Sequence, residues 1–514
     1  MQTEAVTSRK TAFSAKGFRA AVASLVKQTA DLYLADSIPW VVGYSGGKDS
    51  TATLSLIWSA ISSIPSEKRS KPVYVISTDT MVENPIVSSW VTLSLDRMAT
   101  AATEQDLPFH PNRLLPRLED RYWVNLIGKG YPAPRPKFRW CTSRLKINPS
   151  NAFIKSIVSD NGEAILVLGT RKAESASRRA SIERYEGDST RSLLSRNGNA
   201  QLDRVWVYSP IVDWSNDDVW QYLMQTKNPW GHDNKLLLGM YQGATSDGEC
   251  PLVVDTSTPS CGDSRFGCYV CTLVDKDKSM QAMIRNDQEK EWMLPLSEFR
   301  NRFLDIKDDR RHRDFRRMNG SLMLFHGQLV HGPYLQEYRE VLLAELLRAQ
   351  TAAQALAPPE LANLQLITLD EIEEIRRIWV LEKHEFEDTV PAIYERCVGS
   401  AYPFPKLEET RLLQSDDLLL LREICQERGD AEGTQFRLLR ELLNVEESYR
   451  HASRRSGLYE QLETAIKSGG FRNEEEALAY ALSQQSIASH LVQEPEGEPY
   501  DYELDLRPTG DDAK

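Results

Sequence analysis

The residues best suited to chemistry form one short run, Ser45-Gly46-Gly47-Lys48-Asp49-Ser50. Its adjacent glycines let the backbone turn tightly and approach a ligand closely. The lysine adds a positive charge and the serines add hydroxyl donors. An apolar run at 40–44 predicts a strand before the loop, and 51–63 predicts a helix after it, whose first amides and dipole favour an anion. We therefore expect this loop to hold a phosphate chain.

The loop differs from a Walker A motif. That motif needs Gly six residues before its Lys and Ser or Thr directly after it, and those positions hold Val42 and Asp49. The string SGGKDS instead resembles the PP-loop of ATP pyrophosphatases, which cleave ATP between the α- and β-phosphates. Such cleavage yields an adenylated substrate and pyrophosphate. A glycine-rich turn without a ligand is the alternative, and this string directly after a strand disfavours it.

A second cluster consists of cysteines. Four of the seven fall close together, with ten, six and two residues between them: Cys250, Cys261, Cys268 and Cys271. Four thiolates complete either a tetrahedral zinc site or an iron–sulfur cluster. The spacing alone leaves both metals open.

Cys141 stands apart from that cluster. It lies in segment 129–155, which has no Asp or Glu, between Arg139 and Arg144 and close to Lys146. Neighbouring cations favour the nucleophilic thiolate. Cys141 could carry a persulfide, ligate a metal or be an inert cysteine, and the sequence does not separate the first two roles.

Composition sets outer bounds on the function. A chain of 514 residues, 41% hydrophobic and 26% charged, favours a globular protein of two or more domains. The chain has no apolar run near the roughly 20 residues that span a bilayer, and its start has no signal-peptide pattern, so we expect a cytoplasmic protein without a membrane partner. The net charge of −12 argues mildly against simple nucleic-acid binding. Local basic segments at 129–155, 171–191 and 310–317 remain candidates for contact with a polyanion.

The elements that must position these residues alternate in type. Buried strands are expected at 40–44, 73–77, 164–168 and 205–209, with helices between them. This order predicts an α/β fold with a doubly wound parallel sheet. Ligands lie beyond the carboxyl ends of such strands. Residues that follow the second and third strands are therefore candidates for the nucleotide's base and ribose, namely Thr78, Asp79, Gly169 and Arg171. For Asp79 alone, an ordinary helix cap is an equal alternative.

The chain divides by composition. We expect a nucleotide-binding domain with the cysteine cluster at 1–290, a mixed connecting region at 291–350, and a helical domain at 360–490. A linker is expected at 352–359. Residues 491–514 are acidic and rich in proline, which predicts a disordered tail.

Several motifs, in chain order, resemble phosphoadenylyl-sulfate (PAPS) reductase domains. After SGGKDS come Cys141-x4-Lys146-x2-Pro149, Gly169-x-Arg171, and Pro210-x2-Asp213-Trp214-x4-Val219-Trp220. Within this superfamily, segment 259–272 (PSCGDSRFGCYVCT) resembles the cysteine signature of the DndC-type sulfurtransferases of bacterial DNA phosphorothioation. The length and the helical C-terminal extension agree with that family. The specific motifs cover roughly residues 15–350.

The resemblance implies a set of cofactors and partners. ATP would bind at Ser45–Ser50, and a [4Fe–4S] cluster at the four cysteines of 250–271. We expect Mg²⁺ to accompany ATP, with Lys48, Asp49 and Cys141 as the catalytic residues. The partners would be a cysteine desulfurase as sulfur donor, the other Dnd proteins and the DNA backbone. Thr142 stands where iron–sulfur adenylyl-sulfate reductases have the second cysteine of a tandem pair, so their ligand set does not transfer whole, and Cys141 is left as a sulfur-handling candidate.

Three rival functions remain. An adenylyl-sulfate or PAPS reductase would use the same loop, but such enzymes usually carry a catalytic cysteine near the C-terminus, and no cysteine follows Cys425. A tRNA thiolase would share the chemistry and act on a base. A non-catalytic iron–sulfur DNA-binding subunit would have a relict loop, and the intact Lys48 and Asp49 argue against it.

Overall fold

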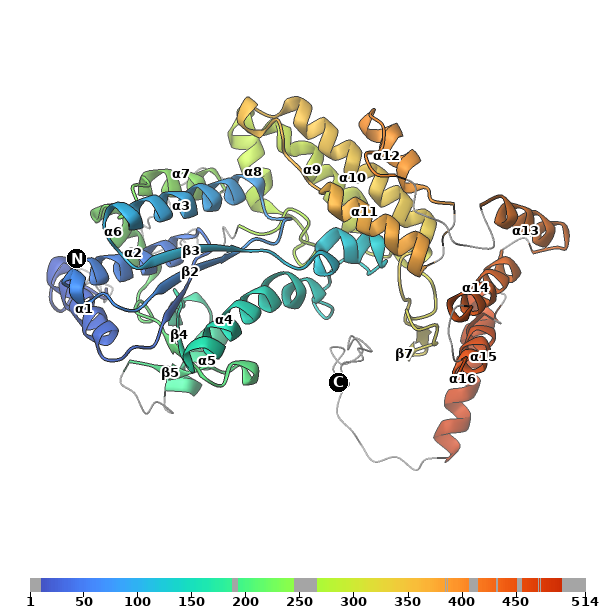
Figure 1. Cartoon of the computed structure of the whole chain (residues 1–514), viewed down its shortest axis with the longest axis horizontal. Helices are drawn as coiled ribbons and strands as arrows, with labels where there is room; N and C mark the ends of the chain where they lie inside the picture. Colours follow the sequence, from blue (N-terminus) through green and yellow to red (C-terminus); the bar gives the residue numbers. More distant parts are fainter. Residues whose placement is uncertain are drawn as a thin grey trace, which may run out of the picture. The chain divides into compact units, whose positions relative to one another are not determined.

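The chain forms two compact units. The computed structural model describes residues 11–186, 193–244, 266–383, 385, 387–405, 415–430, 433–450, 455–469, 471 and 473–491. Unit 1 comprises Met1–Arg117 and Trp140–Ser297, and unit 2 comprises Leu118–Arg139 and Glu298–Lys514 (Figure 1). No helix among the described residues is long and apolar enough to cross a membrane.

This division differs from the expected domains in two respects. Segment 118–139, expected within the first domain, belongs to unit 2. There the indole of Trp123 donates to the carbonyl of Leu366 at 2.7 Å, and that of Trp379 donates to the carbonyl of Ile127 at 3.0 Å. Residues 298–350 also share unit 2 with the later helices and are not a separate connecting region. The expected acidic tail lies outside the described residues.

Unit 1 is built on a six-stranded sheet in the order β3-β2-β1-β4-β6-β5. The strands are β1 Trp40–Gly43, β2 Val73–Thr78, β3 Phe109–Leu114, β4 Ala164–Val167, β5 Ser195–Arg196 and β6 Val205–Tyr208. Every neighbouring pair is parallel except β5 with β6, which is antiparallel. The predicted doubly wound α/β fold is confirmed, and the two-residue β5 makes the sheet mixed instead of purely parallel.

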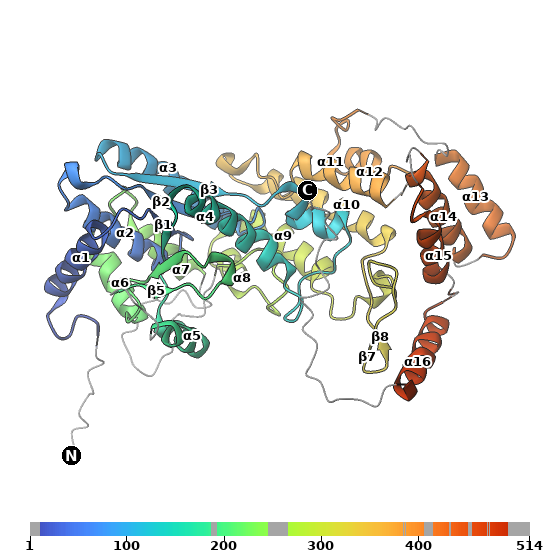
Figure 2. The ribbon, with the colours of Figure 1, turned by 60° about the horizontal axis from the view of Figure 1, so that its bottom comes forward.

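Helices cover both faces of this sheet, because the central strands are apolar on both sides. The helices of unit 1 are α1 Phe18–Leu34, α2 Lys48–Ser62, α3 Pro85–Glu104, α4 Asn148–Asn161, α5 Ala176–Glu186, α6 Asn216–Gln225, α7 Asn234–Gly243 and α8 Lys278–Asn286. Helix α4 packs Ile154 and Ile157 against Val41 and Ile76, whereas α2 and α3 lie on the opposite face (Figures 1 and 2).

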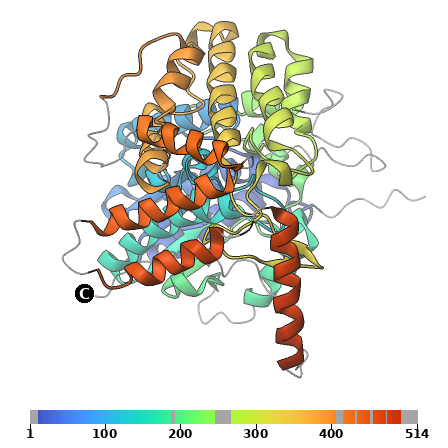
Figure 3. The same ribbon diagram turned by 90° about the vertical axis from the view of Figure 1, so that its right-hand side faces the viewer.

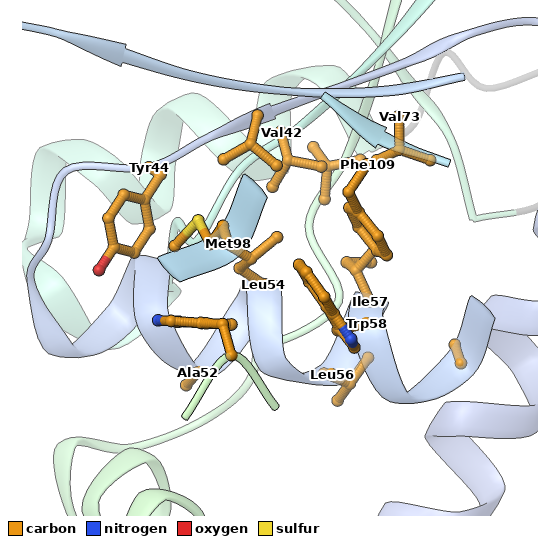
Figure 4. Close-up of a cluster of buried hydrophobic side chains, with 14 of the residues drawn as sticks. Val42, Tyr44, Ala52, Leu54, Leu56, Ile57, Trp58, Val73, Met98 and Phe109 are labelled. Carbon is orange, nitrogen blue, oxygen red and sulfur yellow. The ribbon is translucent and has the colours of Figure 1, made fainter. Parts of the chain in front are cut away.

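The main core lies between α2 and the sheet. In Figure 4, Leu54, Ile57 and Trp58 of α2 lie with Val42, Val73 and Phe109 of the strands. The rings of Trp58 and Phe109 stack with centroids 4.1 Å apart. Because this core fixes α2 against β1, it also fixes the loop that joins them.

Unit 2 is mostly helical, as predicted for the C-terminal region (Figure 3). Its elements are α10 Gln336–Leu356, α11 Leu369–Arg377, α12 Val390–Val398, α13 Ser415–Glu427, α14 Thr434–Tyr449, α15 Leu458–Gly469, α16 Glu474–Leu491 and a small hairpin of β7 Leu324–Phe325 and β8 Gln328–Leu329. Helix α9 Leu294–Phe299 spans the boundary of the two units. Helix α10 continues through most of the expected 352–359 linker, because that segment begins with good helix formers, AAQAL. A capping box precedes α11, with Thr368 Oγ1 accepting from the amide of Glu371 at 3.3 Å.

Candidate active site

The loop motif of residues 45–50 comprises the turn after β1 and the first residues of α2, at the point where the strand order reverses. Strands β2 and β3 lie on one side of β1, and β4 and β6 lie on the other. Crevices for ligands form at such a switch point in open α/β sheets. Gly46 has φ +74°, and a Cβ there would lie 2.5 Å from Cγ2 of Val91, so the loop requires glycine at this position.

Hydroxyl and indole groups hold the loop in shape. The Ser50 hydroxyl donates to the carbonyl of Gly47 at 2.9 Å and accepts from the amide of Ser45 at 3.2 Å. The indole of Trp90 donates to the carbonyl of Gly46 at 3.2 Å. Gly47 is the N-cap of α2 and makes no side-chain hydrogen bond to the helix. Backbone amides in the first turn of α2 are therefore not capped by a side chain, and such amides suit an anion.

Lys48 and Asp49 begin α2 beside a buried tyrosine. The amide of Lys48 donates to the hydroxyl of Tyr241 at 3.3 Å, and the Lys48 ammonium lies 5.3 Å from the centre of the Tyr241 ring. Burial raises the pKa of Tyr241, so the phenol stays neutral. Tyr241 has no signal in the sequence, because only the packing of α7 brings it to the loop.

Asp49 lies between two cations. Its carboxylate accepts from Nε of Arg171 at 2.7 Å and pairs with Nζ of Lys48 at 3.3 Å. Arg171 is buried and also donates to the carbonyl of Trp214 at 3.2 Å. Gly169 makes this approach possible, since a Cβ there would lie 2.8 Å from the carbonyl oxygen of Asp49. The loops after β1 and β4 thus meet at this carboxylate.

A cavity of about 410 Å³ opens above the loop. This volume is within the range of sites for small molecules and cofactors. All six loop residues and Arg171 line it, and so do Glu83, Lys146, Glu174 and Tyr241. Glu83 is a site residue that sequence analysis missed, because a lone glutamate after a strand has no motif.

Two of the cysteines lie beside this cavity. The backbone of the segment that carries Cys268 pairs with residues 82–84. The amide of Tyr269 donates to the carbonyl of Val82 at 3.0 Å, and Glu83 and Cys268 form an isolated antiparallel β-bridge. The amide of Cys271 donates to the carbonyl of Cys268 at 3.0 Å, so the C-x-x-C sequence forms one tight turn. Lys146 pairs with Glu83 at 3.5 Å, and both residues line the cavity together with the loop.

The pKa values of Cys141 and Cys268 are both raised, whereas the sequence analysis expected a lowered pKa for Cys141. Burial raises the pKa of Cys268 to about 11, and Lys146 offsets only part of that rise. Burial also raises the pKa of Cys141, with a further rise from the nearby Cys271. Burial thus shifts the pKa of Cys141 in the direction opposite to the one expected from the flanking cations.

The predicted metal ligands are only partly described. Cys250 and Cys261 lie outside the described residues, whereas Cys268 and Cys271 lie on the tight turn beside the cavity. Within the described ranges, no three His, Cys, Asp or Glu side chains form a group able to hold a metal ion. The iron–sulfur cluster accordingly stays a proposal.

Thr78 and Asp79 do not line the cavity of the loop. The hydroxyl of Thr78 pairs with that of Ser150 at 2.8 Å. Asp79 accepts from the amide of Met81 at 2.7 Å and from the guanidinium of Arg113, including a bond from Nε at 3.0 Å. These local bonds engage the Asp79 carboxylate without a ligand, which agrees with a local structural role for this residue.

The basic segment 310–317 of unit 2 is largely neutralised by its own carboxylates. Arg310 pairs with Asp308 at 2.6 Å, and Arg316 pairs with Asp314 at 2.9 Å. Arg313 lies 3.3 Å from Asp309. This pairing weakens the segment as a candidate surface for DNA phosphates.

Comparisons with known proteins agree with this fold. Residues 39–272 match the family described as the phosphoadenosine phosphosulfate reductase domain. An uncharacterized protein of Methanocaldococcus jannaschii is 26% identical over 240 residues, which is 46% of this chain and 37% of that protein. The chain thus aligns with little more than a third of that relative's length.

Solved structures with similarity to the chain include two nucleotide-related enzymes. The match to a PAPS reductase of Candida auris in complex with phosphate covers 41% of this chain and 89% of that reductase, with 13% identity and a TM-score of 0.25. The match to an FMN adenylyltransferase of Candida glabrata covers 40% of this chain and 57% of that enzyme, with 11% identity and a TM-score of 0.23.

The family match and the site agree on a class of protein. Residues 39–272 are similar to the phosphoadenosine phosphosulfate reductase domain. The loop SGGKDS lies within this matched segment.

Proposed function

We propose that unit 1 is an ATP-dependent sulfurtransferase, which adenylates an acceptor oxygen with release of pyrophosphate and then replaces that oxygen with sulfur. One observation carries this proposal. The phosphate loop opens into the same cavity that Lys146 lines, and Lys146 lies within electrostatic range of Cys268 and Cys141. The residues that would activate the nucleotide therefore lie close to the thiols that would handle sulfur.

In the adenylation step, the acceptor oxygen attacks the α-phosphorus of ATP and pyrophosphate leaves. The amides at the start of α2 and the ammonium of Lys48 stabilise the charge that develops on the leaving group. Arg171 holds Asp49 in place through its 2.7 Å bond and keeps the loop closed against β4. The attack turns a very poor leaving oxygen into a good one, and this is why ATP is required.

We propose that Mg²⁺ accompanies ATP, bound mainly through the phosphates of the nucleotide. Magnesium usually takes one or two protein carboxylates together with substrate phosphates and water. The cavity presents the carboxylates of Asp49, Glu83 and Glu174, and Asp49 is itself one of the loop residues that would hold the phosphates. The ion would neutralise charge on the leaving pyrophosphate.

In the sulfur step, the terminal sulfur of a persulfide on Cys141 attacks the activated phosphorus, and AMP leaves. The product is linked to Cys141 through an S–S bond. A thiol reductant then cleaves that bond, which releases the phosphorothioate and leaves a disulfide between Cys141 and the reductant. A second equivalent of thiol restores Cys141. The persulfide itself would come from a cysteine desulfurase.

We propose a DNA backbone phosphate as the acceptor. Support comes from segment 259–272, which resembles the cysteine signature of the DNA phosphorothioation sulfurtransferases. The remaining Dnd proteins would then be the partners. A [4Fe–4S] cluster on Cys250, Cys261, Cys268 and Cys271 would supply electron transfer or sulfur binding beside the site; Cys268 and Cys271 already share one turn there.

The proposed activation is tested by pyrophosphate release from ATP, with DNA and the sulfur donor present. Lys48→Ala should lower the rate by about 100-fold or more, because it removes charge stabilisation of the leaving group. Lys27→Ala is the matched control, since Lys27 is an exposed lysine that pairs with Asp31 on α1. Absence of pyrophosphate release under every combination of DNA and partners would overturn the proposal.

The acceptor is tested separately. Nuclease digestion of host DNA, with and without the gene, should yield phosphorothioate dinucleotides by mass only when the gene is present. Thiolated nucleosides in tRNA would instead identify a tRNA thiolase, and sulfite from a sulfonucleotide would identify a reductase. A brown, iron-loaded protein with absorption near ~400 nm after oxygen-free purification would support the cluster, and a colourless zinc protein would refute it.

A further inference from the structure

Tyr241 lines the cavity above the loop of residues 45–50, and the proposed chemistry does not use it. This tyrosine belongs to α7 and is 7% exposed. A buried tyrosine usually finds hydrogen-bond partners for its hydroxyl. The partners that the Tyr241 hydroxyl has, and the one that it lacks, indicate what it can do for a ligand in the cavity.

The hydroxyl of Tyr241 lies against the turn where phosphates would bind. It accepts a hydrogen bond at 3.3 Å from the amide of Lys48, the first residue of α2. Gly47 makes this approach possible, since a Cβ there would lie 3.2 Å from the Tyr241 hydroxyl and 3.6 Å from Oγ of Ser45. The hydroxyl thus lies beside the first turn of α2, where the helix favours an anion.

Aromatic packing holds the ring of Tyr241 in place. Trp220 of α6 contacts the ring edge to face, with centroids 5.2 Å apart, and Phe266 contacts it in the same manner at 4.8 Å. Trp220 is itself completely buried. A ring packed against two others does not swing away easily when a ligand arrives. We therefore expect the hydroxyl to keep its position and to become part of the wall that a ligand contacts.

The Tyr241 hydroxyl has a proton to donate. Its bond with Lys48 uses only a lone pair of the oxygen. Among the residues that the structure describes, none accepts the phenolic proton. Asp49 lies within electrostatic range of the phenol, but its carboxylate bonds Arg171 and Lys48. Burial raises the pKa of Tyr241, and Asp49 raises it further, so the proton is retained at neutral pH.

We propose that the hydroxyl of Tyr241 donates a hydrogen bond to the phosphate chain of ATP and stabilises pyrophosphate as it leaves. This inference rests on the proposed function, because it places the phosphates of ATP at the loop of residues 45–50. Negative charge builds on the leaving phosphates as their bond to the α-phosphorus breaks, and hydrogen bonds to charged acceptors are the stronger ones. A donor that is already in position stabilises this charge without reorganisation. Tyr241 is then a catalytic residue that lies outside the loop motif.

Binding of inorganic pyrophosphate to the full chain, measured by isothermal titration calorimetry, tests this contact. Tyr241→Phe keeps the ring and removes the hydroxyl, and it should weaken pyrophosphate binding about tenfold. Tyr222→Phe is the matched control, because Tyr222 is a buried tyrosine of α6 that does not line the cavity. Unchanged affinity in Tyr241→Phe would overturn the inference. Tighter binding would also overturn it, since the hydroxyl would then compete with phosphate for the Lys48 amide.

AMP distinguishes a direct contact from a distorted loop, because it lacks the leaving phosphates. Tyr241→Phe should leave the affinity for AMP unchanged. An equal loss of affinity for AMP and pyrophosphate would assign the effect to the shape of the loop and overturn the inference. In the pyrophosphate-release assay, kcat of Tyr241→Phe should fall about tenfold or more, with a smaller change in the KM for ATP.

Lys48→Ala separates this inference from the proposed function. If the unmodified protein binds pyrophosphate and Lys48→Ala weakens that binding while Tyr241→Phe does not, the loop binds phosphate and only the role of Tyr241 is wrong. If the unmodified protein binds neither pyrophosphate nor ATP, both the proposed activation and the role of Tyr241 are wrong.

Discussion

At the scale of single residues, the site depends on one carboxylate shared by two cations. Asp49 accepts from Arg171 and pairs with Lys48, so it balances their charge when no nucleotide is bound. A polyphosphate competes with Asp49 for Lys48, because both are anions within reach of the same ammonium. Arg171 cannot leave as readily, since it is buried and its guanidinium also bonds the carbonyl of Trp214.

Arg171→Lys tests this division of roles. Lysine keeps the charge but has no planar fork, so it cannot bond Asp49 and the Trp214 carbonyl together. We expect the KM for ATP to rise about tenfold in the pyrophosphate-release assay, with a smaller effect on kcat. Lys172→Arg is the matched control, because Lys172 is the next residue and pairs with the exposed Asp213. An unchanged KM in Arg171→Lys would contradict the assigned role.

His232 predicts a pH dependence of stability. It is 5% exposed, its Nδ1 lies 3.1 Å from the hydroxyl of Ser94, and burial, together with Arg97, lowers its pKa to about 4. The unfolded chain binds the proton near pH 6.5, whereas the folded chain resists it until about pH 4. Stability from neutral His232 is therefore complete above pH 6.5 and is lost as the pH falls, by about 3 kcal/mol at most.

Urea unfolding at about pH 7 and about pH 4.5 measures this loss. His232→Phe should reduce the difference between the two pH values, and His110→Gln should not, because His110 is exposed on β3. If both variants retained the full pH dependence, another group would be responsible.

At the scale of elements, the loop after β4 is pressed against the first turn of α2. Gly169 is the contact: a Cβ there would meet the Asp49 carbonyl oxygen at 2.8 Å and Oγ1 of Thr53 at 2.9 Å. A backbone carbonyl cannot yield as a flexible side chain can. The geometry of the phosphate loop therefore depends on a glycine that lies about 120 residues away in sequence from it.

Gly169→Ala should separate this loop from α2 and lower the free energy of unfolding by about 1–3 kcal/mol, with a loss of ATP affinity. Gly239→Ala is the matched control, because Gly239 lies in α7 and a Cβ added there would have nothing within 4 Å. That substitution should leave stability equal or raise it by about 0.5–1 kcal/mol. Thermal or urea unfolding decides between these outcomes, and equal stability of the two variants would contradict the close contact.

Sequence patterns predicted the elements with strong periodicity and missed those without it. Strands β1, β2, β4 and β6 are apolar runs, and all four were expected within a residue or so of their observed bounds. Strand β3 has the sequence FHPNRL, which is polar and contains proline, so nothing in it marks a strand. Proline is tolerated there because β3 is the edge of the sheet.

The candidate site divides in the same way. The loop of residues 45–50 and Arg171, which line the same cavity, were predicted together because their motifs are local in sequence. Glu83 and Tyr241 reach the same cavity only through packing, from the loop before α3 and from α7. No spacing rule connects residues 83 and 241 to residue 48, so sequence reasoning had no signal for them.

At the scale of the whole molecule, the two units are interleaved in sequence. Segment 118–139 leaves unit 1 after Arg117 and returns to it at Trp140. Within unit 2 this segment buries Trp123, Val124, Leu126 and Ile127. A cut at the end of unit 1 would therefore separate these apolar side chains from the residues that cover them.

A fragment ending at residue 297 should accordingly aggregate, whereas the same fragment with 118–139 replaced by a Gly-Ser linker should be soluble and should retain the fold of unit 1. Size-exclusion chromatography and circular dichroism compare the two fragments. Equal solubility would show that segment 118–139 does not need unit 2 to cover its apolar residues.

Because the units are interleaved, the chain crosses between them three times, after Arg117, after Arg139 and after Ser297. The second of these crossings lies next to the proposed sulfur site in sequence, because only Trp140 separates it from Cys141. A substitution or cut at this crossing therefore changes the backbone directly beside the thiol that we expect to handle sulfur.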